Sequence, residues 1–388
     1  LLIGNGPVVG DALITNKSID GICFTGSTTV SQLINKNSAD KGNPKASIIA
    51  ETGGINAMIV DSTALPEQAV KDIIASSFQS AGQRCSALRV LYLQEDIANK
   101  FLSMLYGAMD ELIINNPWHD NTDIGPIISK NAAKQINKYI QLALKNKNVL
   151  YQVDTPYNDA FVKPTVIKVK SILDLEKEIF GPVLHIATFK SGEISSIVND
   201  INKKGYGLTF GIHSRIDSRI HYLCENLNVG NIYVNRNQIG AVVGSQPFGG
   251  EGLSGTGPKA GGPSYLYQFV KNEVNPSFDY IDKKITISEA QHIINNCPKP
   301  KRKAIKSISL PGPTGESNIL TTYPKGVILC LGPSIEQAKI QEKTVNASGS
   351  IACIILGLDL DLLSKLENFS AVILWSKVND VRKARYDC

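Results

Sequence analysis

The sequence predicts an α/β fold with a mostly parallel sheet. Short apolar segments rich in Val, Ile and Leu alternate with longer amphipathic segments through most of the chain. Such alternation is typical of parallel strands joined by helices that cover the faces of the sheet. The composition agrees, because 388 residues with 43% hydrophobic and 19% charged side chains suffice for a large globular core.

The expected elements follow one another regularly. Apolar runs predict strands at 21–26, 45–52, 56–61, 88–93, 182–189, 207–214 and 230–235. Helical periodicity predicts helices near 27–38, 66–80, 95–114, 129–146, 192–203 and 217–226. Beyond residue 276, a turn-rich cluster at 309–318 precedes expected strands at 323–332, 348–357 and 369–377. The last part of the chain therefore resembles a small separate α/β unit.

Cys85 lies on the short connection between an expected helix and an expected buried strand. The helix places Ala69, Ile73 and Phe78 on one face, and "GQRC" then leads into the apolar run 88–93. Loop residues held by rigid elements often carry chemistry. Cys85 is therefore a candidate thiolate nucleophile, and the alternative is a small buried hydrophobic residue.

Two glutamates lie next to expected strands. Glu51 ends an apolar run and is followed by Thr52 and two glycines. It is a candidate general base whose pKa is raised by burial, or else a cap of the next segment. Glu178 lies in "EIFGPV" before a strand, where it is a candidate ligand of a ribose hydroxyl pair or a surface acid.

Residues 244–263 are unusually rich in glycine. They form either a disordered linker or a close-packed loop, since glycine permits tight backbone approach. The Pro247-Phe248 pair supplies an aromatic anchor, which favours the packed loop.

Charge and cysteine usage exclude several classes of function. A net charge of +5 with dispersed basic residues argues against nucleic acid or a membrane surface as partner. Seven scattered cysteines without C-x-x-C, and five histidines without H-x-x-x-H, suggest neither disulfides nor a metal site. No signal peptide or transmembrane segment appears, so a reducing cytoplasm is the expected compartment.

Five motifs together resemble the aldehyde dehydrogenase superfamily over about residues 1–275. They are "FTGST" (24–28), "ETGG" (51–54), "GQRCSA" (82–87), "EIFGPV" (178–183) and "PFGGEGLSGTG" (247–257). Residues 235–263 look like the L-glutamate gamma-semialdehyde (1-pyrroline-5-carboxylate) dehydrogenase module of proline utilization A, a group of fused proline-catabolic enzymes. The end of the chain resembles the extra C-terminal domain of longer members.

The resemblance implies an aldehyde-dehydrogenase-like fold in four parts. Residues 1–52 would be the C-terminal part of a Rossmann-type NAD-binding domain, and 53–250 the catalytic thiol domain. Residues 251–275 would be the return and oligomerisation segment, and 276–388 a truncated C-terminal domain.

The resemblance also implies NAD-dependent oxidation of L-glutamate gamma-semialdehyde to L-glutamate. Cys85 would attack the aldehyde and become a thioester, which Glu51 would hydrolyse by activating water. The implied NAD-binding residues are Gly26, Ser27, Thr52, Gly53, Glu178 and Phe180. The implied substrate-binding residues are Ser86, Gly240, Ala241 and Phe248, of which the first three would meet the substrate carboxylate.

The family's nucleotide-binding domain begins upstream of the position that matches Leu1. We therefore expect the remaining part to come from a longer or complementary chain, and the isolated 388-residue chain to bind NAD⁺ poorly. A proline dehydrogenase module is expected upstream or in trans, and homo-oligomers are expected. Two alternatives stay open: a non-catalytic remnant that acts as an assembly partner, and a Cys/His hydrolase with a histidine near Cys85.

Overall fold

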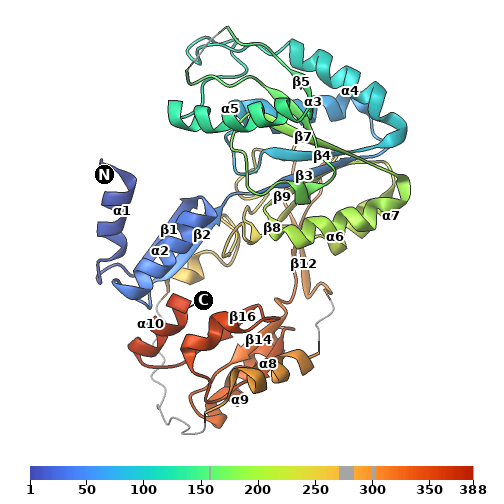
Figure 1. Ribbon diagram of the computed structural model, residues 1–388. Helices are drawn as coiled ribbons and strands as arrows, with labels where there is room; N and C mark the ends of the chain where they lie inside the picture. Colours follow the sequence, from blue (N-terminus) through green and yellow to red (C-terminus); the bar gives the residue numbers. More distant parts are fainter. Residues whose placement is uncertain (157–158, 271–283, 299–301, 388) are drawn as a thin grey trace. The chain divides into compact units, whose positions relative to one another are not determined.

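The computed structural model describes residues 1–388 except 157–158, 271–283, 299–301 and 388. The chain divides into two compact units (Figure 1). Unit 1 comprises Leu1–Ala50, Gly244–Gln246 and Pro263–Cys388, and unit 2 comprises Glu51–Val243 and Pro247–Gly262. The predicted boundary between residues 275 and 276 lies outside the described residues.

Unit 2 is built on a seven-stranded sheet with the order β10-β9-β3-β4-β7-β6-β5. Its strands are β3 (Asn56–Val60), β4 (Leu88–Gln94), β5 (Val149–Gln152), β6 (Thr165–Lys168), β7 (Val183–Phe189), β9 (Thr209–His213) and β10 (Asn231–Val234). Neighbouring strands are parallel, except that β5 runs antiparallel to β6. The predicted α/β class with mostly parallel pairing is confirmed.

Helices cover both faces of this sheet (Figure 1). On one face pack α3 (Pro66–Phe78), α4 (Glu95–Asp110) and α5 (Lys130–Lys145), against side chains such as Met58 and Leu91. On the other pack α6 (Ile194–Lys204) and α7 (Asp217–Asn226), against side chains such as Ile59 and Tyr92. Consecutive residues of one strand thus enter opposite cores, which explains why the central strands are continuous apolar runs.

The glycine-rich segment of unit 2 is ordered by backbone pairing. β11 (Glu251–Gly252) pairs antiparallel with β8 (Tyr206–Gly207). Single bridges also join Glu51 to Gly255 and Phe248 to Ala260. The structure therefore agrees with a packed loop and not with a disordered linker.

Unit 1 combines the N-terminal elements with a small C-terminal α/β assembly. The N-terminal elements are α1 (Gly6–Ile14), β1 (Gly21–Gly26), α2 (Thr28–Asp40) and β2 (Ser47–Thr52), whose last two residues belong to unit 2. The C-terminal elements are α8 (Ile287–Asn296), α9 (Ile335–Ala347), α10 (Val378–Asp387), β12 (Lys306–Leu310), β13 (Asn318–Thr322), β14 (Val327–Cys330), β15 (Ile351–Ile354) and β16 (Ala371–Ile373).

The C-terminal strands form two sheets within unit 1. β15, β14 and β16 make a parallel sheet in that order, around buried side chains that include Leu329 and Cys353. β12 and β13 form a hairpin, so the predicted turn cluster at 309–318 covers its turn. Arg385 on α10 donates to the carbonyl oxygens of Pro44 (2.8 Å) and Ala46 (2.9 Å), which ties the last helix to the N-terminal segment of the same unit.

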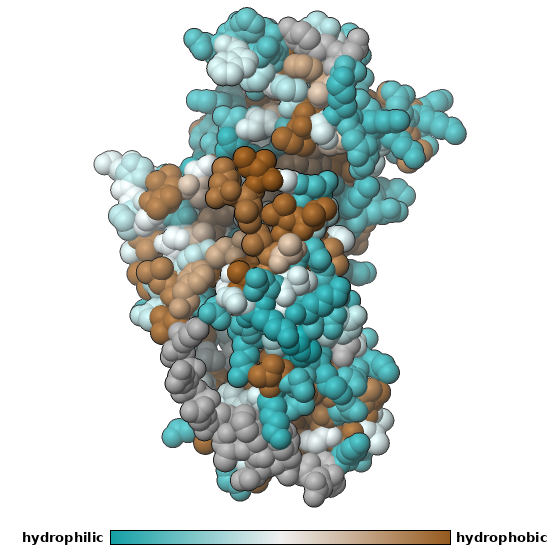
Figure 2. Space-filling view, turned by 90° about the vertical axis from the view of Figure 1, so that its left-hand side faces the viewer, coloured by the Kyte–Doolittle hydropathy of each residue, from teal (hydrophilic) through white to brown (hydrophobic). Residues whose placement is uncertain are grey.

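Part of the surface is apolar. Figure 2 shows brown, apolar residues gathered on the face that it presents. Several large apolar side chains of unit 1 are exposed, among them Leu266, Tyr267, Phe269 and Val270. No helix in the described residues is long and apolar enough to cross a membrane.

Candidate active site

A tight turn between α3 and β4 positions Cys85. After α3, a short 3-10 turn (Gln79–Gly82) contains Ser80, Ala81 and Gly82, all with positive φ. A Cβ atom at Gly82 would lie 2.2 Å from the carbonyl oxygen of Gly181, so only glycine fits there. The chain reverses direction within a few residues, and Cys85 stands just before β4 in a partly exposed position.

Asn56 fixes the backbone around the cysteine. Its Nδ2 donates to the carbonyl oxygens of Cys85 (2.7 Å) and Ala87 (2.9 Å), and its Oδ1 accepts from the Thr209 N–H (3.1 Å). Asn56 and Thr209 begin β3 and β9, which flank each other in the parallel sheet. The cysteine thus lies at the amino-terminal edge of these strands, where the sheet itself holds it.

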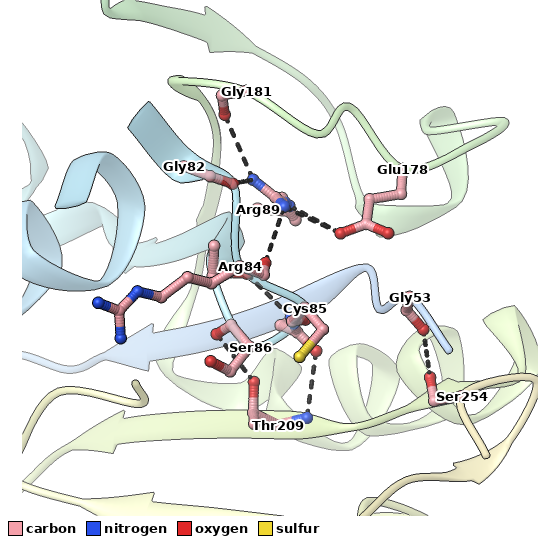
Figure 3. Close-up of polar contacts among 12 residues, drawn as sticks. Gly53, Gly82, Arg84, Cys85, Ser86, Arg89, Glu178, Gly181, Thr209 and Ser254 are labelled. Carbon is pink, nitrogen blue, oxygen red and sulfur yellow. Dashed lines mark hydrogen bonds and ion pairs between the residues drawn. The ribbon is translucent and has the colours of Figure 1, made fainter. Parts of the chain in front are cut away.

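Arg89 is a fully buried cation beneath this turn. Its guanidinium donates to the carbonyl oxygens of Gly82 (2.8 Å) and Arg84 (3.1 Å), and to that of Gly181 (3.3 Å). It also forms an ion pair of 2.9 Å with Oε1 of Glu178. Figure 3 shows Arg89 between the cysteine turn and the loop that carries Glu178 and Gly181. One side chain therefore connects the two segments.

Glu178 is not a surface acid. Its side chain is only 16% exposed and is paired with Arg89. Its second oxygen, Oε2, lies against Gly53, where an added Cβ atom would approach it to 2.1 Å. Burial raises the pKa of Glu178, against the opposing effects of Arg89 and a backbone N–H of Gly54. The carboxylate therefore packs closely against glycine backbone, where a larger residue would displace it.

Glu51 is held by a distant segment of unit 2. Its Oε2 accepts a hydrogen bond from the Gly250 N–H (3.1 Å), while its buried Oε1 has no hydrogen-bond partner within the described residues. Burial raises the pKa of Glu51 to about 7, despite the Gly250 N–H and the charge of Lys259. The structure does not support a role as a cap of the next segment, because the carboxylate turns toward the glycine-rich segment.

The environment of Cys85 favours the protonated form of its sulfur. Burial raises the pKa of the thiol, and the carboxylates of Glu178 and Glu51 raise it further, while nearby backbone N–H groups act in the opposite direction. Glu51 and Glu178 therefore both act electrostatically on Cys85. A nucleophilic thiolate must be generated here by removing the proton at the time of reaction.

Ser86 and the Gly240–Ala241 segment are connected through Gln238. The fully buried Gln238 side chain donates from Nε2 to the carbonyl oxygen of Ser86 (3.3 Å) and to Thr209 Oγ1 (3.3 Å). Its backbone N–H donates to Ser76 Oγ (3.1 Å), and Gly240 has φ of 72°. Gln238 thereby anchors the loop that carries Gly240 and Ala241 to Ser86, the third residue predicted to bind the substrate carboxylate.

The other predicted site residues have varied surroundings. Thr52 is tied to the glycine-rich segment through Leu253 and Ser254, and Phe248 pairs with Ala260. The Phe180 ring lies 5.4 Å from the Arg89 guanidinium and is 44% exposed.

Gly26 and Ser27 belong to unit 1, where Ser27 caps α2 by accepting a hydrogen bond from the Val30 N–H (3.3 Å). A helix N-terminus of this kind suits phosphate.

The two buried histidines, His185 and His213, have polar contacts with groups other than Cys85. His185 has both ring nitrogens engaged, with the Tyr139 hydroxyl and the Arg89 carbonyl oxygen. His213 lies 3.5 Å from Asp72. Burial lowers the pKa of each histidine to about 4. Within the described residues there is also no group of three His, Cys, Asp or Glu side chains that could hold a metal ion.

Sequence reasoning did not single out Asn56, Arg89, Gln238 or Lys259. Arg89 offered a signal, since a charge inside an apolar strand must find a partner. The other three are polar residues whose neighbours come from distant segments, so local sequence carried no such signal.

Comparison with known proteins identifies the fold. The family model described as "Aldehyde dehydrogenase family" matches residues 1–274. The chain belongs to the aldehyde dehydrogenase family. The resemblance predicted from the five motifs and the aldehyde-dehydrogenase-like fold are thus confirmed.

Two relatives have sequences similar to that of this chain. The bifunctional protein PutA of Klebsiella aerogenes is 44% identical over 94% of this chain and 31% of its own length. The 1-pyrroline-5-carboxylate dehydrogenase of Geobacillus kaustophilus is 36% identical over 68% of this chain and 52% of its own length. The chain therefore spans about a third of PutA and about half of the shorter enzyme.

Two solved structures have folds similar to that of this chain. A mutant of proline utilization A from Bradyrhizobium japonicum matches with a TM-score of 0.66 and 47% identity, over 69% of this chain and 27% of that protein. The 1-pyrroline-5-carboxylate dehydrogenase from Thermus with bound NAD matches with a TM-score of 0.65 and 32% identity, over 70% of this chain and 53% of that protein.

Proposed function

We propose that this chain carries the thiol-dependent centre of an NAD-dependent dehydrogenase that oxidises L-glutamate gamma-semialdehyde to L-glutamate in proline catabolism. The observation that carries the proposal is that the Cys85 thiol stands on a turn held by Asn56 and Arg89, within electrostatic reach of the Glu51 carboxylate. Burial raises the pKa of that carboxylate to about 7. The names of the relatives support the substrate and the pathway.

The proposed chemistry divides one oxidation into two steps. The Cys85 thiolate adds to the aldehyde carbon and gives a thiohemiacetal. NAD⁺, when bound, accepts the hydride that leaves this carbon, which turns the thiohemiacetal into a thioester. Glu51 then takes a proton from water, whose oxygen attacks the thioester, releasing the carboxylic acid and the Cys85 thiolate.

Glu178 and Gly53 fit the ribose of the cofactor in this proposal. Oε2 of Glu178 lies against the bare backbone of Gly53, and Arg89 holds the other oxygen of the same carboxylate. A carboxylate fixed in this way accepts hydrogen bonds from a pair of hydroxyl groups. Ser27 and Gly26 would contribute phosphate-binding backbone, with Thr52 and Phe180 as further cofactor contacts.

The substrate carboxylate is assigned to Ser86, Gly240 and Ala241 in this proposal. A hydroxyl and two backbone N–H groups form a neutral anion site, which can bind a carboxylate without a cation. The anchoring of both segments by Gln238 supports this role, because it fixes the loop relative to the cysteine turn. Phe248 would line the apolar part of the substrate path.

The larger assembly is also a proposal. PutA relatives are named bifunctional, which supports a proline dehydrogenase module elsewhere in the natural protein or in a partner chain. Exposed apolar side chains such as Leu266 and Tyr267, 78% and 73% exposed, support homo-oligomer formation.

Replacement of single thiols in the natural protein that carries this chain tests the proposal. Cys85→Ala should abolish NADH formation from glutamate semialdehyde. Cys224→Ala is the matched control, because Cys224 is also a partly exposed free thiol whose pKa is raised by burial. Retained turnover in Cys85→Ala would overturn the proposal.

A further inference from the structure

Lys259 turns its ammonium group into the glycine-rich segment of unit 2. Its Nζ donates to the carbonyl oxygens of Gly230 and Gly249 (3.2 Å for the latter) and to Asn231 Oδ1 (2.9 Å). All three acceptors are neutral. Burial lowers the pKa of Lys259 to about 8, while the carboxylates of Glu251 and Glu51 act in the opposite direction. A cation is therefore held in a partly desolvated position beside the candidate base.

Gly249 separates Lys259 from Glu51. A Cβ atom at this glycine would lie 2.9 Å from Glu51 Oε1 and 3.0 Å from the Cα atom of Lys259. The next residue, Gly250, donates its N–H to Glu51 Oε2. Asn231 Oδ1 accepts from the Gly249 N–H (3.3 Å) as well as from Lys259. One short backbone segment thus contacts the carboxylate on one side and the lysine on the other.

We propose that Lys259 is a positioning residue for the general base: its ammonium group favours the carboxylate form of Glu51 and fixes the Gly249–Gly250 backbone that binds it. The inference rests on the proposed role of Glu51. A nearby positive charge lowers the free energy of a partly buried carboxylate, and a neutral side chain at 259 removes that stabilisation. Lys259 itself need not touch the substrate.

Other charged groups around this pair enter the expected pH dependence. The carboxylates of Glu51 and Glu178 both act electrostatically on Cys85. Glu251, in β11, acts in the same way on Lys259. Loss of the Lys259 charge leaves these carboxylates in place, so the carboxylate form of Glu51 becomes harder to populate. The pH midpoint of any step that requires this base should therefore rise.

Ester hydrolysis isolates that step without requiring NAD⁺. With p-nitrophenyl acetate, the Cys85 thiolate displaces p-nitrophenolate and becomes an acetyl thioester, which appears as a burst. Water, deprotonated by Glu51, then releases acetate and the thiolate. The rate of acetyl loss, measured on the isolated acetyl-enzyme across pH 6–9, reports the state of Glu51 directly.

Three substitutions separate charge from structure. Lys259→Gln keeps an amide donor, Lys259→Met keeps the aliphatic stem, and Lys259→Arg keeps the charge. We expect the first two to raise the midpoint of deacetylation by about one pH unit. The rate would then fall about tenfold at pH 6 and less than twofold at pH 9, as a one-unit shift requires. Lys259→Arg should stay near the wild-type midpoint.

The outcomes distinguish this inference from the proposed function. The pH midpoint of deacetylation could stay unchanged in both Lys259→Gln and Lys259→Met, even if the rate falls equally at every pH. This result would overturn the role of Lys259 and leave the proposed function intact. A burst that survives Cys85→Ala would overturn the proposed function and the inference with it. Thermal melting of each variant identifies a protein that has lost its fold, and the remaining neutral variant then decides.

Discussion

Arg89 and Glu178 form a buried ion pair that joins the turn carrying Cys85 to the loop that carries Glu178 and Gly181. The N–O distance is 2.9 Å, and the Arg89 side chain is fully buried. Because the same guanidinium binds the carbonyl oxygens of Gly82, Arg84 and Gly181, the pair is also a structural connection. Its loss should therefore affect both stability and thiol reactivity.

Arg89→Met should strongly destabilise unit 2. The substitution leaves the Glu178 carboxylate buried without its cation, at a cost of about 3–5 kcal/mol. Hydrogen exchange of β4 amides measures the free energy of opening in this region. Arg84→Met is the control, because within the part of the chain that the structure describes the Arg84 side chain makes only an exposed hydrogen bond to Ser80 Oγ (3.1 Å). Equal losses in the two variants would contradict this role of Arg89.

Glu178→Gln should accelerate alkylation of Cys85. The Glu178 carboxylate raises the pKa of the thiol, so its neutralisation lowers that pKa and increases the thiolate fraction at a given pH. Iodoacetamide labelling at pH 8, followed by peptide mass spectrometry, measures the rate. Glu176→Gln, at an exposed position nearby, should leave the rate unchanged. A slower reaction in Glu178→Gln would show that the sign of the electrostatic effect is wrong.

Thioester hydrolysis should increase with pH through about 7. Glu51 acts as a base only as a carboxylate, and its pKa is raised to about 7. The deacylation rate should therefore be small at pH 5.5 and level off above pH 8. The Glu51→Gln variant should lose this pH dependence and most of the deacylation rate. Its NADH burst should persist, because the burst precedes deacylation. Equal slowing of burst and steady state would argue for a structural role of Glu51.

The substrate carboxylate should contribute strongly to kcat/KM. In the proposed site, an aldehyde of similar length without it leaves the buried Ser86 hydroxyl unpaired, at about 1–3 kcal/mol. It also loses the contacts with the exposed Gly240 and the partly exposed Ala241. Glutamate semialdehyde should then be favoured by about tenfold or more. Competition between the two aldehydes measures the ratio, and Ser86→Ala should reduce it. Comparable values in the unaltered protein would refute this anion site.

Local sequence predicted the central strands and the amphipathic helices because each is periodic. The strand at 56–61 and the helix at 217–226, for example, recur as β3 and α7. The edge strand β5 and its neighbour β6 were not predicted, since both are short and β5 pairs antiparallel with β6. α1 was also missed, because Gly6 and Gly10 disguise its helical pattern.

The candidate site was predictable only where a motif marked it. Cys85 and Glu51 stood out by their positions beside strands and by the family resemblance. Their supports come from far along the chain: Gln238 reaches Ser86, and Gly250 reaches Glu51. Periodicity contains no information on such contacts, because they depend on how the sheet and the glycine-rich segment pack together.

The central claim is that Cys85 forms the covalent intermediate and Glu51 resolves it. The most direct test is peptide mass spectrometry of the Glu51→Gln form of the natural protein, quenched in acid after reaction with NAD⁺ and glutamate semialdehyde. We predict one glutamyl thioester on Cys85, formed with one equivalent of NADH and absent in the unaltered protein at steady state. An adduct on another residue, or NADH formed without any thioester on Cys85, would contradict the claim.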